Sequence, residues 1–348
     1  MARLEEVCEI LDSKRIPITA KDRVAGQYPY YGANGVQDYV ADYIFDDELV
    51  LVAEDGGHFG SADKPIAYRV SGKCWVNNHA HVLKPKECID VDYLCYSLMF
   101  RDVSDIVNGA TRQKLTQADM RKIEIPLLPM KNQKAVVDKL GKVFELIALR
   151  KEQLAKLDQL VKSRFIELFG DPITNSKNLP TERMEQRFNL KAGITTAAEN
   201  IHDFEEGKFE VPCYGGNGIR GYVEEKSYSG NYPIIGRQGA LCGNVQYATG
   251  DFHATEHAVL VSLLKNDNAI WVYHLLKLMD LYRYHTGAAQ PGLAVKTLNT
   301  VEVFVADRNK QDQFATFVEQ ADKSKLAIQQ SLDKLELLKK SLMQEYFG

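Results

Sequence analysis

The chain has 348 residues, of which 45% are hydrophobic and 26% are charged, and its formal net charge is −4. This length predicts roughly two domains, and the composition excludes collagen-like, mucin-like and wholly disordered chains. A slightly acidic protein has no general attraction for polyanions, so any surface for nucleic acid would have to be local. No apolar run reaches the roughly 18 residues of a membrane span, and the first residues lack the order of a signal peptide, so we expect a cytoplasmic protein.

The first 131 residues predict a domain of mixed α and β structure. Short β-branched and aromatic runs at residues 48–53 and 123–125 are typical of strands. Asn34-Gly35 predicts a tight hairpin of type I′, in which both central residues need a positive φ. A helix is expected at residues 92–100.

Residues 132–170 change to the three-and-four spacing of a long helix with one apolar face. Arg150 and Arg164 interrupt that face, and its other positions are apolar. Several successive heptads without proline predict a coiled-coil seam. The apolar seam positions are Val136, Leu140, Val143, Ile147, Leu154, Leu157, Val161 and Leu168.

The second half of the chain repeats the first. Residues 171–182 are polar and contain two prolines, as linkers do. The hairpin segment at residues 31–36 returns 183 residues later as Tyr214-Gly215-Gly216-Asn217-Gly218-Ile219, and further on the two copies align with an offset of 178. The repeat predicts a second domain at residues 183–309, with a helix at 268–281, followed by a second long helix at 310–348.

The second long helix has an apolar face that complements the first. It places Ile328 and Leu342 where the first helix carries its two arginines. We therefore predict an α+β protein of two pseudo-symmetric mixed α/β domains, with the two helices paired as an antiparallel coiled coil about 50 Å long. The alternative is two amphipathic helices, each packed on its own domain. The seam positions of the second helix are Phe314, Val318, Ile328, Leu332, Leu335 and Leu342.

The sequence predicts no catalytic site and no metal site. His253-Ala254-Thr255-Glu256-His257 matches the H-x-x-E-H pattern of zinc proteases by letters, but that pattern requires a helix. The aligned segment of the first copy, residues 75–83, reads as extended chain, in which residues four apart are too distant to share a metal. The six cysteines include no C-x-x-C pair, so we expect reduced and mostly buried thiols.

Polar segments present in both copies are the candidates for binding nucleic acid. The loops at residues 108–114 and 286–292 combine glycine with polar side chains that suit phosphates and base edges, and an exposed structural loop is their alternative. His79 and His257 are either groove-facing or structural histidines. Arginine binds guanine bidentately, and tyrosine donates to phosphate. The candidate DNA-binding residues are Tyr28, Tyr30, Tyr31, Asn34, His79, Thr111, Arg112, Gln113, Lys114, Tyr214, Asn217, Arg220, Arg237, Gln238, His257 and Gln290.

The order of four duplicated or flanking segments carries a family resemblance. The sequence resembles, over essentially its whole length, the specificity subunit of a type I restriction-modification system. The segments that carry this resemblance are Tyr30-Tyr31-Gly32-Ala33-Asn34-Gly35, Ala53-Glu54-Asp55-Gly56, residues 109–115 and residues 165–172.

The resemblance implies a division of labour in a larger complex. Each target-recognition domain would read one half of a bipartite sequence in double-stranded DNA, and the helices would set the spacing. Two modification methyltransferase subunits would bind S-adenosylmethionine and methylate adenine after flipping the base, and restriction (translocase/nuclease) subunits would complete the enzyme. The resemblance therefore implies a noncatalytic chain without a cofactor of its own, and it transfers no base-contacting residues. The open alternatives are an enzyme in its own right and a duplicated protein-interaction scaffold.

Overall fold

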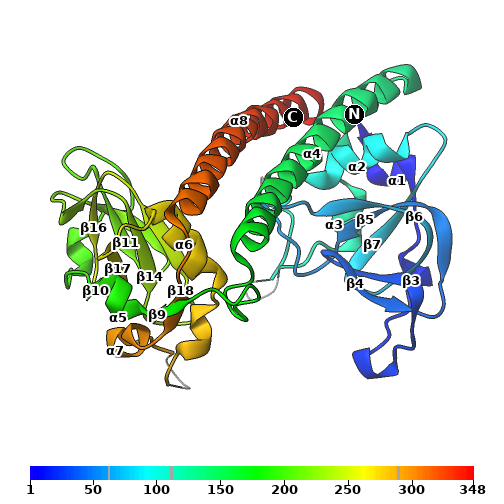
Figure 1. Cartoon of the computed structure of the whole chain (residues 1–348). Helices are drawn as coiled ribbons and strands as arrows, with labels where there is room; N and C mark the ends of the chain where they lie inside the picture. Colours follow the sequence, from blue (N-terminus) through cyan, green and yellow to red (C-terminus); the bar gives the residue numbers. More distant parts are fainter. Residues whose placement is uncertain (62, 110–112, 288–290) are drawn as a thin grey trace. The chain divides into compact units, whose positions relative to one another are not determined.

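The computed structural model describes residues 1–61, 63–109, 113–287 and 291–348. The chain divides into two compact units, one of residues 1–151 with 330–348 and the other of residues 152–329. Each unit combines one mixed α and β domain with parts of both long helices. Both chain termini lie in the first unit (Figure 1).

The domain of the first unit is built around one six-stranded sheet with the strand order β2-β7-β5-β6-β3-β4. Neighbouring strands are antiparallel except β3 and β6, which pair in parallel. β1 and β8 form a separate antiparallel pair. The elements of this domain are β1 (Ala2–Arg3), α1 (Leu4–Val7), β2 (Cys8–Ile10), η1 (Asp12–Lys14), η2 (Ala20–Asp22), β3 (Ala25–Gly32), β4 (Gly35–Val40), β5 (Phe45–Ala53), β6 (Ala67–Val76), β7 (Ala80–Pro85), α2 (Val91–Met99), α3 (Gln117–Arg121) and β8 (Glu124–Ile125).

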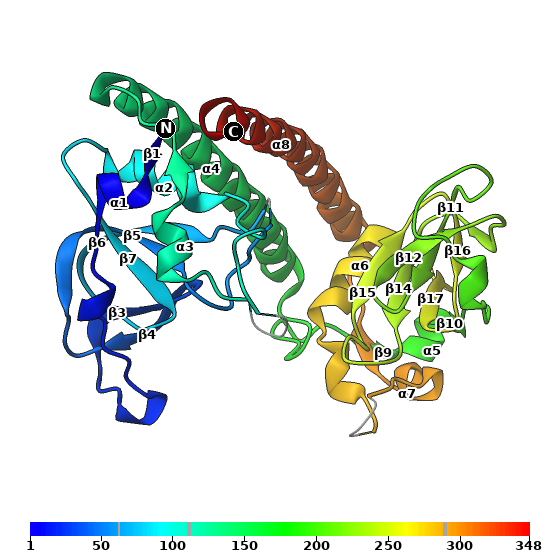
Figure 2. The ribbon, with the colours of Figure 1, turned by 180° about the vertical axis from the view of Figure 1, so that it is seen from behind.

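The central strand β5 is buried on both faces. Residues 49–53 are fully buried, which is why this segment reads as a continuous apolar run rather than an alternating one. Leu49 and Leu51 belong to the core cluster on one face of the sheet. α2 packs against β5 and β6 and lies between the sheet and the long helix α4 (Figures 1 and 2), where the rings of Tyr96 and Phe144 stack 5.3 Å apart.

The second unit repeats this domain with two interrupted strands. Its sheets have the orders β10-β17-β14-β15 and β12-β11-β16-β13, and β9 pairs with β18. Here too one neighbouring pair, β11 and β16, is parallel. The elements are β9 (Thr181–Arg183), α5 (Met184–Arg187), β10 (Phe188–Ala192), η3 (Ala198–Asn200), β11 (Val211–Gly215), β12 (Gly218–Val223), β13 (Tyr228–Ser229), β14 (Tyr232–Gly236), β15 (Val245–Ala248), β16 (Asp251–Ala254), β17 (Ala258–Leu263), α6 (Ala269–Leu278), η4 (Leu281–Tyr284), α7 (Val295–Asn299) and β18 (Glu302–Phe304).

The second unit divides the sheet at two glycines, one of which has a counterpart at a bend in the undivided sheet of the first unit. β6 bends at Gly72, where φ is +74°, and the aligned residue Gly250 has the same φ of +74° between β15 and β16. A left-handed residue is cheap only for glycine, so both copies keep it at this bend. In the second unit β13 and β14 are further separated by Gly230, with φ +125°, where β5 runs through without a break.

Both predicted hairpins form, but their predicted turn type is wrong. β3–β4 and β11–β12 are antiparallel hairpins with two-residue turns, Ala33-Asn34 and Gly216-Asn217. φ is positive at Gly35 (+110°) and Gly218 (+99°), whereas neither asparagine is among the described residues with a positive φ. The glycine therefore follows the turn rather than forming its second central residue, as in a hairpin with a glycine bulge.

The short helices fall where the repeat predicts them, with one change of length. α2 matches its prediction within a residue, because Asp90 caps its first turn by accepting from the backbone N–H groups of Asp92 and Tyr93. α6 begins after Asn268, which caps it in the same way. It ends at Leu278 rather than Leu281, because the chain continues into the 3-10 helix η4 beyond Asp280, which has φ +50°.

The two long helices, α4 (Met130–Phe169) and α8 (Arg308–Phe347), run antiparallel in both units. In the first unit Lys139 donates to Tyr346 at 3.0 Å and Lys151 pairs with Glu336 at 3.0 Å. In the second unit Lys325 pairs with Asp158 at 2.7 Å. Contacts whose residue numbers rise on one helix and fall on the other define an antiparallel pair, as predicted.

The apolar seam of this pair faces inward, and its ends merge with the domain cores. Of the fourteen predicted seam residues, nine are buried and five are half-buried. The sequence reading missed Phe165 and Phe169, which are fully buried among Phe304, Phe314 and Trp271 of the second unit. From Val161 onward the buried residues of α4 are spaced four apart, at Val161, Phe165 and Phe169. Coiled coils alternate spacings of three and four, so this spacing indicates a helix that packs on a domain.

The cysteines match the prediction of reduced, mostly buried thiols. All six are free, and only Cys88 is exposed. Burial raises the pKa of the Cys8, Cys74 and Cys95 thiols to about 12. Across the described part of the chain, no helix combines the length and apolarity that a membrane crossing requires.

Candidate nucleic-acid interface

Four segments meet at one end of the sheet in each domain. In the first they are the β3–β4 turn, the end of β5, the β6–β7 turn and the loop that precedes Leu115. The backbone N–H of Glu54 donates to the carbonyl of His79 at 2.9 Å, and Leu115 donates to the carbonyl of Glu54 at 2.8 Å. The second domain repeats both bonds, from Arg237 to His257 at 3.0 Å and from Leu293 to Arg237 at 2.8 Å. The fold therefore places the segments that carry the candidate DNA-binding residues at equivalent positions in the two domains.

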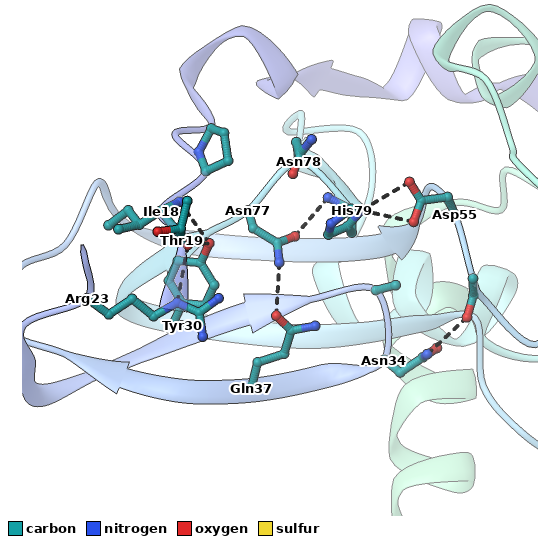
Figure 3. Close-up of a pocket in the computed structure, with 13 residues that line it drawn as sticks. Ile18, Thr19, Arg23, Tyr30, Asn34, Gln37, Asp55, Asn77, Asn78 and His79 are labelled. Atoms are coloured by element: carbon teal, nitrogen blue, oxygen red, sulfur yellow. Dashed lines mark hydrogen bonds and ion pairs between the residues drawn. The ribbon is translucent and has the colours of Figure 1, made fainter. Parts of the chain in front are cut away.

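In the first domain the hairpin turn, the end of β5 and the β6–β7 turn, together with residues 17–23, line a pocket of about 460 Å³ (Figure 3). Asn34 enters it from the hairpin turn and donates to the carbonyl of Gly56 at 3.0 Å, which holds the turn against the end of β5. His79 lies in the β6–β7 turn, with Nδ1 3.0 Å from Asp55 Oδ2. Its backbone N–H donates to Asn77, whose own amide donates to Gln37 at 3.0 Å (Figure 3). The pocket is thus lined by amide groups, which can both donate to and accept from base edges.

The three candidate tyrosines of this domain are held by structural contacts. Tyr30 forms part of the pocket wall but is 1% exposed, with its ring under the guanidinium of Arg23 at 4.2 Å and its hydroxyl bonded to the backbone of Ile18. Tyr31 points to the other side of β3, where its ring lies 5.7 Å from that of Tyr68. Tyr28 packs edge-on against Tyr43 and does not line the pocket.

A buried ionic network lies behind the pocket. Asp12 Oδ2 is 2.6 Å from His81 Nδ1, and the other ring nitrogen of His81 is 2.9 Å from the carbonyl of Leu115. Glu54 is 2.6 Å from Arg15 and 2.8 Å from Lys114. The network therefore ties η1, the end of β5 and β7 to the loop that carries Lys114.

These carboxylates are held in the ionised form. Burial alone would raise the pKa of Asp12, but hydrogen bonds from His81 and Gln117 outweigh it, so the pKa lies below its usual value. Burial is likewise outweighed at Glu54 by hydrogen bonds from Lys114 and Arg15, and its pKa is lowered too. Asp12, Glu54 and His81 form the one described cluster with three potential metal ligands, and their ligand atoms lie within 4.8 Å. Arg15 and Lys114 together already balance the charge of the two carboxylates, so we assign the cluster a structural role.

The second domain presents arginine where the first has glutamate. Arg237 follows β14 as Glu54 follows β5, and its Nε is buried without a hydrogen-bond partner among the described residues. His257 lies beside it in the β16–β17 turn. Its Nδ1 also has no hydrogen-bond partner in the part of the chain that the structure describes, and its Nε2 is 3.2 Å from Glu256. A Cβ at Gly236 would come within 1.9 Å of the carbonyl of Gly216, so only glycine lets the hairpin turn approach β14 this closely.

The remaining candidates of the second domain fall into two groups. Asn217 and Arg220 are exposed on the hairpin, and Asn217 accepts from the amide of Asn244 at 2.6 Å. Gln238 is exposed beside Arg237, and its backbone bridges to Gly292 of the second loop. Tyr214 instead packs edge-on against Phe252 in a core cluster.

The two loops are only partly described. Gln113 and Lys114 are exposed, and Gly56 donates to the carbonyl of Gln113 at 3.4 Å. Thr111, Arg112 and Gln290 lie outside the described residues. The H-x-x-E-H match forms strand and turn, as expected, and not a helix. In the first copy residues 77–79 form a turn, so the extended reading of residues 75–83 is wrong at that point.

Sequence reasoning missed six polar residues that line the pocket: Thr19, Arg23, Gln37, Asp55, Asn77 and Asn78. The signal for Asn77 and Asn78 was their place directly before His79, because a pair of asparagines between two strands is typical of a turn. Gln37 and Asp55 carried no local signal, since their partners are 40 and 24 residues away in the sequence.

Comparison with known proteins follows the same division into two domains. Residues 1–159 and 185–338 match the family model of the type I restriction modification DNA specificity domain. The type I restriction enzyme EcoprrI specificity subunit of Escherichia coli is 47% identical over 133 residues, which are 38% of this chain and 33% of that protein. A putative type I restriction enzyme specificity subunit of Haemophilus influenzae is 39% identical over 134 residues, which are 38% and 34% of the two chains. The matched region therefore spans about a third of the length of these curated relatives.

Two solved structures share the fold over nearly the whole chain. The crystal structure of a type I restriction-modification system S subunit from M. genitalium has a TM-score of 0.68 at 17% identity, covering 100% of this chain and 95% of that one. A chain from a structure on complex assembly and conformational transition of the type I R-M system has a TM-score of 0.55 at 15% identity, covering 99% and 96%. Because the two family matches together span most of the sequence, the chain belongs to the family of type I restriction modification DNA specificity domains.

Proposed function

We propose that this chain is the noncatalytic specificity subunit that selects the DNA target of a type I restriction-modification enzyme. In this proposal each domain reads one half of a bipartite sequence, and α4 with α8 sets the number of unread base pairs between the halves. The family match supports DNA target recognition in general. The duplicated architecture supports reading in two halves, because two similar surfaces on one chain suit two half-sites.

One observation carries this proposal. The same four-segment interface is built twice with the same backbone hydrogen bonds, and its side chains differ between the copies. A catalytic site would need one fixed constellation, whereas recognition of two different half-sites needs one scaffold with variable side chains.

The side chains suggest how the two half-sites differ. The first domain offers the amides of Asn34, Gln37 and Asn78, which suit adenine edges or a mixture of donors and acceptors. The second offers Arg237 with Gln238, a pair suited to guanine and adenine. We therefore infer that the second half-site contains a guanine contacted by Arg237.

The proposal includes partners. Two modification methyltransferase subunits and the restriction subunits would bind this chain, and S-adenosylmethionine would bind the modification subunits rather than this chain. A net charge of −4 means that DNA binding by the isolated chain depends on local contacts. We expect such binding to be weak, with Kd about 10⁻⁶ M or higher at physiological salt, and to tighten when the modification subunits are added. Fluorescence anisotropy of the chain with and without those subunits measures this, and nanomolar specific binding by the chain alone would contradict it.

Deletion of the gene in its native host tests the proposal directly. Adenine methylation is mapped across the genome by single-molecule sequencing in the deletion and parent strains. Loss of one bipartite motif, restored by the gene on a plasmid, is the expected result. An unchanged methylome in a host whose modification genes are expressed would favour the protein-interaction scaffold.

The spacing role has a separate test. One heptad is inserted into α4 between Lys151 and Asp158 and another into α8 between Lys325 and Glu336. Seven residues add about 10 Å of helix and keep the seam in phase, so the unread gap should grow by about three base pairs while both half-sites persist. Altered half-sites with an unchanged gap would refute the role of the helices.

A further inference from the structure

A buried glutamine joins the first domain to the start of its long helix. Gln133 lies in the first turn of α4 and is 0% exposed. Its Oε1 accepts from the backbone N–H of Asp90 at 2.8 Å. Its Nε2 donates to the carbonyls of Cys88 at 3.0 Å and Leu128 at 2.8 Å. One side chain therefore bonds the helix to the segment that enters α2 and to the segment that leaves the domain.

The second domain has the same joint. Gln311, the residue aligned with Gln133, is 1% exposed in the first turn of α8. It accepts from the backbone N–H of Asn268 at 2.7 Å and donates to the carbonyl of Ala306 at 3.0 Å. The same amide nitrogen also donates a hydrogen bond to the carboxylate of Asp267 at 2.9 Å, and Asp267 forms an ion pair with the buried Arg187.

The residues bonded by these glutamines are themselves fixed points of each domain. Asp90 and Asn268 are the N-caps of α2 and α6, the helices that pack between sheet and long helix. Gln133 therefore connects the first turn of α4 to the start of α2, and Gln311 connects the first turn of α8 to the start of α6. Three directional bonds to two segments of the domain define an orientation, which apolar packing alone does not.

The stability of the fold does not by itself require glutamine at positions 133 and 311. A buried amide is costly unless its bonds are satisfied, and an apolar side chain of similar size could fill the same space. In other proteins buried polar groups fix register at the expense of stability. The duplicated glutamine fits that role, because it lies where each domain joins its long helix, and a rotation there would redirect the recognition surface relative to the helix.

We propose that Gln133 and Gln311 are positioning residues that fix the orientation of each recognition domain on its long helix, and thereby restrict the target to one gap length. This inference rests on the proposed function. The half-site sequences are set elsewhere in each domain, so loosening either joint should relax the gap and leave the half-sites unchanged.

The experiment uses the full chain, co-expressed with its modification subunits in a host that lacks them. The variants are Gln133→Met, Gln311→Met and the double variant, since methionine has similar volume but none of the amide's bonds. Lys134→Met and Lys310→Met are matched controls, because those side chains are exposed on the same helical turns. Adenine methylation is mapped by single-molecule sequencing, together with the melting temperature of each purified complex.

The gap selectivity is the ratio of methylation at the native gap to methylation at gaps one base pair longer or shorter. We expect each glutamine variant to lower this selectivity about tenfold, as fits the loss of two or three buried hydrogen bonds. The double variant should relax the gap further, and the lysine controls should match the parent. Reduced methylation with an unchanged gap would overturn the proposal, because a merely structural residue behaves that way. Failure of both single variants to fold would overturn it too. Absence of any bipartite motif with the parent chain would instead refute the proposed function.

Discussion

The two recognition domains share a backbone framework but place opposite charges at its functional end. Glu54 and Arg237 make the same two backbone hydrogen bonds at the end of the central strand. The Glu54 side chain turns into a buried network with Arg15 and Lys114, whereas the Nε of Arg237 is buried and has no partner within the described ranges. The comparison teaches that the framework depends on backbone hydrogen bonds, so the side chain at this position can differ between the copies without changing the framework.

The domains also differ where the long helices end on them. Phe165 and Phe169 of α4 fill the core of the second unit, with the Phe169 ring 5.8 Å from that of Trp271. The aligned residues of α8 are Met343 and Phe347, which are half-buried, and the Phe347 ring lies 5.3 Å from that of Tyr93. A cavity of about 560 Å³ lies beside them in the first unit. One junction is a closed aromatic core and the other an open groove.

The largest expected effect comes from substitutions that test the difference between the two junctions of helix and domain. Phe165→Ala removes a fully buried ring with three aromatic neighbours, so it should lower the free energy of unfolding of the second unit by about 3–5 kcal/mol. Met343→Ala at the aligned, half-buried position should cost about 1–2 kcal/mol. Denaturant titrations of the full-length variants measure both, and equal losses would contradict the difference between the junctions.

Acid should distinguish the two domains. Burial, together with the charges of Lys277 and Lys325, lowers the pKa of His274 to about 3. The unfolded chain binds a proton near pH 6.5 and the folded domain does not, so the second domain should lose stability as the pH falls from about 6.5, by about 1 kcal/mol per pH unit. His274→Gln should flatten this dependence, and His202→Gln, a control at an exposed histidine of the same domain, should not.

The first domain should respond only at lower pH. The aligned residue there is Tyr96, and the carboxyls of Asp12 and Glu54 have lowered pKa values. Their stabilisation is complete above the unfolded values near pH 4 and is lost as the pH falls below them. Hydrogen exchange between pH 6.5 and 4.5 resolves the two domains, and earlier opening of the first domain would contradict the assignment.

Exchange of the charged residues sharpens the comparison of the interfaces. Arg237→Gln should weaken binding of the assembled complex to its target about tenfold and relax one position of the second half-site, as loss of a bidentate base contact does. Glu54→Gln should leave the second half-site unchanged. Binding selections from a randomised DNA library measure both effects. If the Arg237 variant instead relaxed the sequence preference in the first half-site, the assignment of the second domain to the second half-site would be wrong.

The smallest effect concerns Lys114. Its side chain is half exposed and pairs with Glu54, so Lys114→Gln should change stability by about 0.5 kcal/mol at most. If Lys114 contacts a phosphate, the same change should reduce the slope of log K against log salt by about 0.9 without altering the half-sites. Lys122→Gln, an exposed lysine on α3, should leave the slope unchanged.

The sequence by itself determined the duplication, the antiparallel helix pair and the positions of the hairpins and of α2, because each depends on local spacing or on similarity between the copies. It did not identify Phe165 and Phe169, since the change from a coiled-coil face to a domain-packing face appears only once the partner surface is known. It misjudged the hairpin turn, where the left-handed glycine follows the turn instead of lying within it. Only the tertiary structure placed Gln37 and Asp55 beside Asn77 and His79, and Gln133 under α2, because long-range contacts have no signal in local periodicity.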